Sequence, residues 1–156
     1  MSAPTPRTGQ PALPVTFRPR LTRLVLLTIA LALFVTITVV ALMLESLGPG
    51  DRVTFILFAV LFSGVLVLLA RPRIVADENG VTVVNITRTR RLAWAQILQV
   101  NLRVGDPWLF LGLSDGTSLP ALGIQPGLSK QQAVRDAGEL RRLVASRGSG
   151  SGAEAG

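Results

Sequence analysis

RTRRLAWAQILQV, residues 88–100, joins three arginines to an alternation of apolar and polar side chains around one tryptophan. A period of two predicts a β-strand with one buried face and one wet face. Arg91 and Gln99 lie on the wet parity, and residues 95–97 interrupt the pattern as a turn or a bulge. The buried parity continues past the stretch and holds Leu92, Trp94, Leu98, Val100, Leu102 and Val104.

Short apolar runs separated by turn residues surround this stretch. Asn79-Gly80 and Asp115-Gly116 are dipeptides that type I′ hairpin turns prefer, because both central residues need a positive φ. The spacing predicts a small antiparallel β-sheet or partly open barrel. Its six expected strands are Arg73–Asp77, Val81–Thr87, Arg91–Ala95, Leu98–Val104, Trp108–Ser114 and Thr117–Leu122.

A C-terminal α-helix is expected to close this domain, which spans residues 71–147. Ser129 with Gln132 fits an N-cap and capping box, with Lys130 as the first helical residue. Gly148 is the expected stop, and residues 148–156 are expected to form a flexible Gly/Ser tail. One helical stripe holds the apolar residues Ala133, Ala137, Leu140, Leu143 and Val144.

Two uncharged runs precede the domain and predict an α-helical transmembrane hairpin over residues 24–70. Residues 24–44 and 53–70 contain 21 and 18 residues without a charge. Helices of these lengths cover about 32 and 27 Å, close to the roughly 30 Å of a hydrocarbon core. The first run is too long for the apolar part of a signal peptide, and a second run follows it closely.

Small residues recur along both runs. Thr28, Ala32 and Thr36 have a four-residue spacing, and the second run offers Ala59 and Ser63. Such rows allow two helices to approach closely in lipid. The alternative is that Ala and Thr are merely frequent in this chain.

The distribution of charge predicts the orientation of the hairpin. The loop over residues 45–52 carries two acidic residues and one arginine. Arginines flank the outer ends of both runs, so the positive-inside bias places both termini in the cytoplasm. Residues 1–23, with five prolines up to residue 20, are expected to be a disordered cytoplasmic tail. The flanking arginines are Arg7, Arg18, Arg20, Arg23, Arg71 and Arg73.

The segment VADENGVTVVNITRTRRLAWAQI, residues 75–97, resembles the bacterial pleckstrin-homology (PH) domain. It contains a strand, an Asn-Gly turn, a second strand, a basic turn, and a Trp followed three residues later by Ile. With its two-helix anchor, the chain is similar to small actinobacterial membrane proteins that carry such a domain, which implies the inner membrane. Six strands are one fewer than this fold usually has, so part of the sheet is either missing or supplied by a partner.

The composition argues against an enzyme. The chain has no His, Cys or Tyr, which removes the usual general base, thiolate ligands and Ser–His or Cys–His pairs. No carboxylate pair or glycine-rich phosphate loop stands out, so we expect no catalytic, cofactor or metal site. Nucleic-acid binding is disfavoured too, because residues 71–147 carry a net charge of only +5, from eleven basic and six acidic residues.

Six residues are candidates for contact with a lipid or a partner. The sharper hypothesis is that the arginines dock the domain on anionic headgroups, and the alternative is that they solubilise a turn and enforce topology. Trp94 shares the parity of the apolar face and is expected in the core. Trp108 begins a run that is apolar on both parities; the core is slightly favoured, with an interfacial anchor as the alternative. The candidates are Arg71, Arg73, Arg88, Arg90, Arg91 and Trp108.

We therefore expect a membrane-anchored, cytoplasm-facing PH-like module that binds or organises something at the inner leaflet. Its partner is a protein, a lipid or a second copy of the chain. The alternative is an accessory subunit of a larger membrane complex, in which the hairpin is the interacting part. A weaker alternative is an anionic-lipid headgroup binder that acts through the basic turn.

Overall fold

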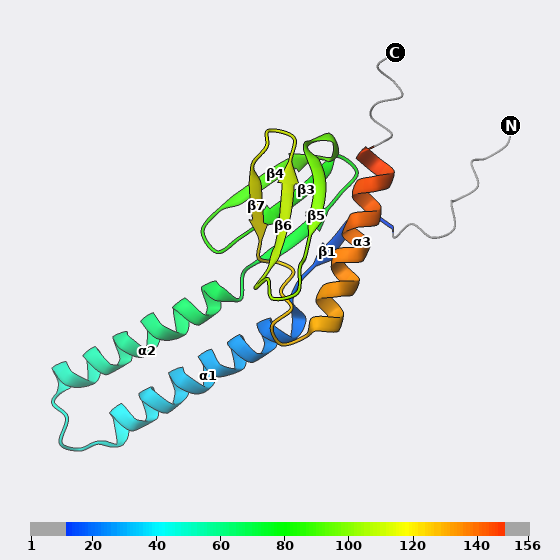
Figure 1. Ribbon diagram of the computed structural model, residues 1–156. Coiled ribbons are helices and arrows are strands. Elements are labelled where there is room, and N and C mark those ends of the chain that lie inside the picture. Colours follow the sequence, from blue (N-terminus) through cyan, green and yellow to red (C-terminus); the bar gives the residue numbers. More distant parts are fainter. Residues whose placement is uncertain (1–11, 149–156) are drawn as a thin grey trace, which may run out of the picture.

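The computed structural model of the protein describes residues 12–148, which form a long helical hairpin and a small lobe (Figure 1). The hairpin consists of α1 (Arg20–Met43) and α2 (Pro49–Leu69). The lobe ends with α3 (Lys130–Gly148) and contains a short 3-10 helix, η1 (Trp94–Gln96). Its strands are β1 (Val15–Phe17), β2 (Arg73–Ala76), β3 (Gly80–Val84), β4 (Thr89–Ala93), β5 (Ile97–Asn101), β6 (Leu109–Leu113) and β7 (Ser118–Ala121).

The seventh strand, β1, comes from the segment that precedes the hairpin. It pairs antiparallel with β2, from Val15 opposite Ala76 to Phe17 opposite Ile74. The prediction of a disordered tail is therefore wrong for these residues, whereas residues 1–11 lie outside the described part. The expectation of six strands is corrected as well, because the chain supplies the missing strand itself. A three-residue strand in a proline-rich segment is too short to show a strand pattern in the sequence.

The two helices contact each other through small residues, but α1 uses a different face from the one predicted. Ala30 and Ala59 are 3% and 0% exposed, and the Ser63 hydroxyl donates a 3.0 Å hydrogen bond to the Ala30 carbonyl. Ala59 and Ser63 thus lie where the second helix was expected to make contact. The contact predicted for α1 was wrong, since Thr28, Ala32 and Thr36 are all exposed. Small residues are frequent along α1, so spacing alone could not select the contacting face.

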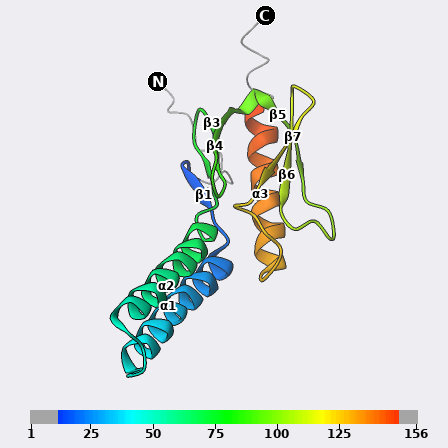
Figure 2. The same cartoon turned by 90° about the vertical axis from the view of Figure 1, so that its left-hand side faces the viewer.

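The lobe consists of two sheets that enclose one hydrophobic core. One sheet has the order β1-β2-β3-β4 and the other the order β5-β6-β7. The barrel is not closed, and Figure 2 shows α3 between the two sheets. A side chain also links the two sheets: Asn85 donates a hydrogen bond to the Pro120 carbonyl at 2.8 Å and accepts one from the Leu122 amide at 3.1 Å. The side-chain amide of Asn85 therefore joins the end of β3 to the end of β7. The largest fully buried side chains are Ile74, Val81, Val83, Leu109, Leu111, Ile124 and Leu140.

α3 begins at Lys130 as predicted and packs against β5 and η1. All five residues of its predicted stripe are buried. Gln132 has different partners from those expected in a capping box, since its side chain donates to the Arg18 carbonyl at 2.8 Å. Gly148 still belongs to the helix, and residues 149–156 of the predicted tail lie outside the described part. The stripe follows from helical periodicity, whereas the Gln132 contact depends on where β1 lies.

Both predicted hairpin turns occur, but neither is type I′. In the described part, positive φ angles are found only at Gly105 and Gly116. Gly80 is required for a different reason: a Cβ there would clash with the Leu92 carbonyl oxygen of the paired strand. In the second turn the Thr117 hydroxyl donates to Asp115 at 2.6 Å, and the Thr117 amide donates at 2.9 Å. These bonds hold the pKa of the Asp115 carboxyl below its usual value.

The alternation of buried and exposed residues around Trp94 is interrupted at η1. Trp94 is buried as predicted, and the predicted interruption is the 3-10 helix followed by an irregular pairing between Ile97 and Gln99. Ile97 then becomes the buried residue, at 3% exposure, and Leu98 is 64% exposed. Val104 is 92% exposed. The predicted parity was therefore wrong for Leu98, because η1 and the irregular pairing shift the phase between Trp94 and the buried Val100. It was wrong for Val104 because this residue lies in a turn after β5.

Replacing Phe17 tests whether β1 is an integral part of the lobe. Phe17 belongs to the core cluster, so Phe17→Ala is expected to lower the free energy of unfolding by about 3–5 kcal/mol. Thr16→Ala changes an exposed residue of the same strand and is expected to cost less than about 0.5 kcal/mol. Thermal and urea unfolding of the purified full-length protein measure both effects. Equal stability of the two variants would contradict this role of β1.

Candidate functional site

The two ends of the hairpin meet at its base, defined as the point where α1 begins and α2 ends. β1 leads into α1 through Arg18 and Pro19, and α2 leads into β2 through Arg71 and Pro72. Because β1 and β2 are paired, these two connections are held beside each other. Figure 1 shows both helices joining the lobe at this one place.

A cavity of about 360 Å³ lies at this base, and we call it the base pocket. One part of its lining is strongly basic, with arginines from both connections and from the first turn of α1. The other part is apolar and comes from facing positions on the two helices. The lining residues are Arg18, Arg23, Leu27, Gly64, Val67, Leu68, Ala70, Arg71, Pro72 and Arg73.

The arginines of the base pocket have no carboxylate partners within residues 12–148. The ion pairs of that part are Arg91–Asp77 and Arg135–Asp136, and both lie elsewhere. The Nε atom of Arg18 is buried and has no hydrogen-bond partner there. Four guanidinium groups around one cavity repel one another, and a buried donor without an acceptor is also unfavourable. The base pocket is therefore suited to an anionic group that accepts several hydrogen bonds.

α3 contacts the base of the hairpin through two polar side chains. The Gln132 amide donates to the Arg18 carbonyl at 2.8 Å and to the Asp136 carboxylate at 3.3 Å. The Asp136 side chain is only 13% exposed, and this burial raises the pKa of its carboxyl above the usual value. The hydrogen bond from Gln132 and the charges of Arg135 and Arg20 oppose the rise without cancelling it.

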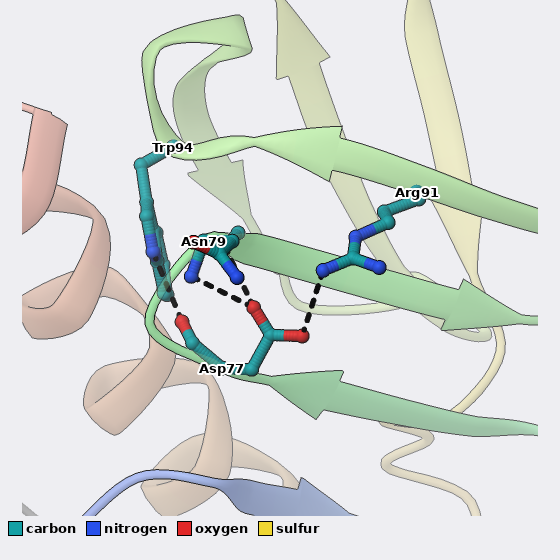
Figure 3. A network of polar contacts seen from close by, with 5 residues as sticks. Asp77, Asn79, Arg91 and Trp94 are labelled. Carbon is teal, nitrogen blue, oxygen red and sulfur yellow. Dashed lines mark hydrogen bonds and ion pairs between the residues drawn. The ribbon is translucent and has the colours of Figure 1, made fainter.

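The other predicted arginines lie on and before β4, away from the base pocket. Arg88 and Arg90 are exposed and have no carboxylate partner among the described residues. Arg91 donates to the Asp77 carboxylate at 3.4 Å, as Figure 3 shows. In Figure 1 the β3–β4 loop projects from the lobe on the side where the hairpin lies. Two of the three charges are thus available to an external anion, and the third is partly neutralised.

Asp77 organises the turn with which Arg91 pairs. Its Oδ1 accepts hydrogen bonds from the amides of Asn79 and Gly80 at 2.8 and 2.9 Å. Its carbonyl accepts a 3.1 Å bond from Nε1 of Trp94, the side chain seen beside it in Figure 3. These contacts fix the β2–β3 turn against η1. Arg91 therefore belongs to a structural network, which makes it the weakest of the predicted contact residues.

Trp108 lies immediately before β6 and outside the core cluster. It is half-exposed, and its ring centroid lies 6.4 Å from that of Phe110 in a tilted arrangement. Its Nε1 atom is buried, so Trp108 lies at the edge of the core and meets the slight preference for a core position only in part. β6 buries Leu109, Leu111 and Leu113 on one face, and Phe110 remains half-exposed on the other.

The base pocket brings together two of the predicted contact residues and two arginines that were not predicted to make such contacts. Arg71 and Arg73 line the base pocket together with Arg18 and Arg23. The latter two were used in sequence analysis only to predict orientation. A signal for their role was present, because an antiparallel hairpin brings the residues before its first helix close to those after its second.

Comparison with known proteins finds a family that the lobe resembles. Residues 71–143 match the family model described as bacterial PH domain, which confirms the predicted resemblance. Uncharacterised proteins of Mycobacterium bovis and of two Mycobacterium tuberculosis strains are 28% identical over 96 residues. This match spans 62% of this chain and 62% of each relative. These relatives fit the expected actinobacterial type, and no solved structure gives a significant match.

The raised pKa of Asp136 predicts a pH-dependent effect of neutralising it. A pKa above the unfolded value of 3.8 means that protonation favours the folded state. This stabilisation is complete below pH 3.8 and is lost as the pH rises through the folded-state pKa. Asp136→Asn is therefore expected to raise the Tm of the full-length protein at pH 7, and the gain should vanish near pH 3.8.

Glu78→Gln removes the same charge from an exposed turn and serves as the control for net charge. A lower Tm of Asp136→Asn than of the wild type at pH 7 would contradict the prediction. That result would mean that attraction to Arg20 and Arg135 outweighs the cost of burial.

Proposed function

We propose that this chain, whose lobe matches bacterial PH domains, is a membrane-anchored binding and scaffold module of the inner leaflet without catalytic activity. The observation that carries the proposal is the pairing of β1 with β2 at the base of the hairpin. This pairing ties the lobe directly to both helices without a flexible linker. A lobe held in this way can act only close to the surface from which the helices emerge.

The surface of the hairpin supports its role as the anchor. α1 and α2 have 24 and 21 residues, which correspond to about 36 and 32 Å of helix, enough for a hydrocarbon core of roughly 30 Å. Only 11% and 6% of their most apolar windows are buried inside the structure. A core helix of a soluble protein would be mostly buried. Lipid is the solvent that such an exposed apolar surface requires.

The ends of the hairpin support the orientation. The base carries the arginines of the base pocket, whereas the opposite end of the hairpin carries Glu45 in the loop and Asp51 with the single Arg52 in the first turn of α2. The positive-inside bias places the more basic end in the cytoplasm. The lobe and the described ends of the chain then lie on the cytoplasmic side.

The charge of the lobe supports contact with an anionic leaflet. Arg88 and Arg90 are exposed near a loop that projects on the hairpin side of the lobe (Figure 1). Each arginine within about a Debye length of an anionic surface contributes roughly 1 kcal/mol. These charges would hold the lobe against the headgroups and leave its remaining surface for a partner.

A second candidate function is that of an accessory subunit whose hairpin contacts another membrane protein. An apolar groove of about 440 Å³ on the hairpin supports this alternative. Phe58 and Phe62 stack there with ring centroids 6.1 Å apart. The groove lies between the two helices and is suited to side chains of a neighbouring helix. Its lining residues are Thr36, Ile37, Val40, Phe55, Phe58 and Phe62.

The proposed topology can be tested with single cysteines, because the natural chain contains none. Ser46→Cys lies between the helices, and Ser114→Cys lies in the β6–β7 turn, where the residue is exposed. A membrane-impermeant maleimide is expected to label Ser46→Cys on intact cells and Ser114→Cys only after permeabilisation. Labelling of Ser114→Cys on intact cells would refute a cytoplasmic lobe.

A further inference from the structure

The base pocket combines a basic surface with an apolar one. Its rim carries Arg18, Arg23, Arg71 and Arg73, and its floor is formed by the apolar side chains of Leu27, Val67 and Leu68. The floor lies between α1 and α2, and the rim lies where the chain enters the lobe. A ligand that satisfies both surfaces must have an anionic end and an apolar end.

Among residues 12–148, no carboxylate forms an ion pair with the rim. The buried Nε of Arg18 has no acceptor there either. A phosphate offers several acceptor oxygens and at least one negative charge, which matches guanidinium donors converging from two directions. Arg18 and Arg23 come from the β1–α1 side, while Arg71 and Arg73 come from the α2–β2 side. One phosphate could therefore bridge both connections.

The floor has room for an apolar chain. Gly64 lines the cavity, and a Cβ added there would meet no heavy atom within 4 Å. The floor would face the acyl region beneath the headgroups if the hairpin spans the membrane as proposed. Basic pockets between helices on the cytoplasmic side are a known means of binding phospholipid headgroups.

We propose that the base pocket binds an anionic phospholipid of the inner leaflet, with its phosphate among the four arginines and its glycerol and upper acyl chain over Gly64. This inference rests on the proposed membrane anchoring. The bound lipid would act as a third connection between the hairpin and the lobe, beside the β1–β2 pairing and the contact of Gln132 with Arg18. Lipid binding should therefore stabilise the full-length protein by mass action.

Two matched variants separate this pocket from general basic attraction. Arg23→Gln/Arg71→Gln removes two charges from exposed residues of the rim, while Arg103→Gln/Arg142→Gln removes two charges from exposed residues outside it. The probe is phosphatidylglycerol, compared with phosphatidylcholine, added to the purified full-length protein in detergent. Retained lipid is counted by native mass spectrometry, and the Tm is followed as lipid is added.

The wild type and the Arg103→Gln/Arg142→Gln variant are expected to retain one phosphatidylglycerol and to gain Tm with it. The rim variant should bind this lipid at least about tenfold more weakly, because each charge-assisted hydrogen bond is strong. Equal weakening in both double variants would overturn the inference, since it would indicate diffuse attraction to the basic surface.

Filling the floor provides a test that leaves the charge unchanged. Gly64→Leu places a side chain in the cavity, and Val65→Leu enlarges a neighbouring residue that is 47% exposed. Lipid retention should be lost in Gly64→Leu and kept in Val65→Leu. Retention in both variants would overturn the proposed position of the acyl chain, and with it the inference.

Two further arms identify the source of the phosphate and separate the two proposals. Inorganic phosphate at millimolar concentration should neither displace the lipid nor raise the Tm as the lipid does; equal protection would mean a free-anion site and overturn the inference. Release of the wild type from membranes by alkaline carbonate would refute the anchoring itself. A wild type that stays in the membrane but does not prefer phosphatidylglycerol would refute only the lipid pocket.

Discussion

The pairing of β1 with β2 across the base of the hairpin is the contact on which the rest of the architecture depends. A three-residue strand is too short to be stable alone. The antiparallel helices bring its partner close in advance, which reduces the entropy lost when the strands pair. The pairing in turn buries Phe17 in the core and holds the lobe at the end of the hairpin without slack. Hairpin and lobe are therefore mechanically one unit, although the family match covers only residues 71–143.

The same pairing concentrates positive charge at one point. Arg18 and Arg71 belong to connections far apart in the sequence, yet both line the base pocket. Clustering of guanidinium groups without carboxylates is unfavourable for an isolated protein. It becomes favourable beside an anionic surface, where each charge has a counterion of fixed position. The fold thus places its least balanced charges where the proposed membrane would offer the most phosphate.

Polar side chains complete a lobe whose sheets do not close. Asn85 joins β3 to β7, and Gln132 joins α3 to the base of the hairpin. Asp77 fixes the β2–β3 turn and holds Arg91 at its edge. Each of these side chains satisfies backbone groups that strand pairing leaves open, as partly buried polar groups require. The barrel stays open, and side chains and α3 bridge its two sheets where strand pairing does not.

The sequence by itself determined the features that depend on local periodicity: the two apolar helices, the strand-and-turn order after residue 71, the burial of Trp94 and the apolar stripe of α3. Only the tertiary structure decided which face of α1 meets α2, why Gly80 is required, and that Val15–Phe17 is a strand. Those features arise from contacts between distant segments, and no local pattern encodes them. The base pocket belongs to this second group, because its arginines become neighbours only when the strands on either side of the hairpin pair.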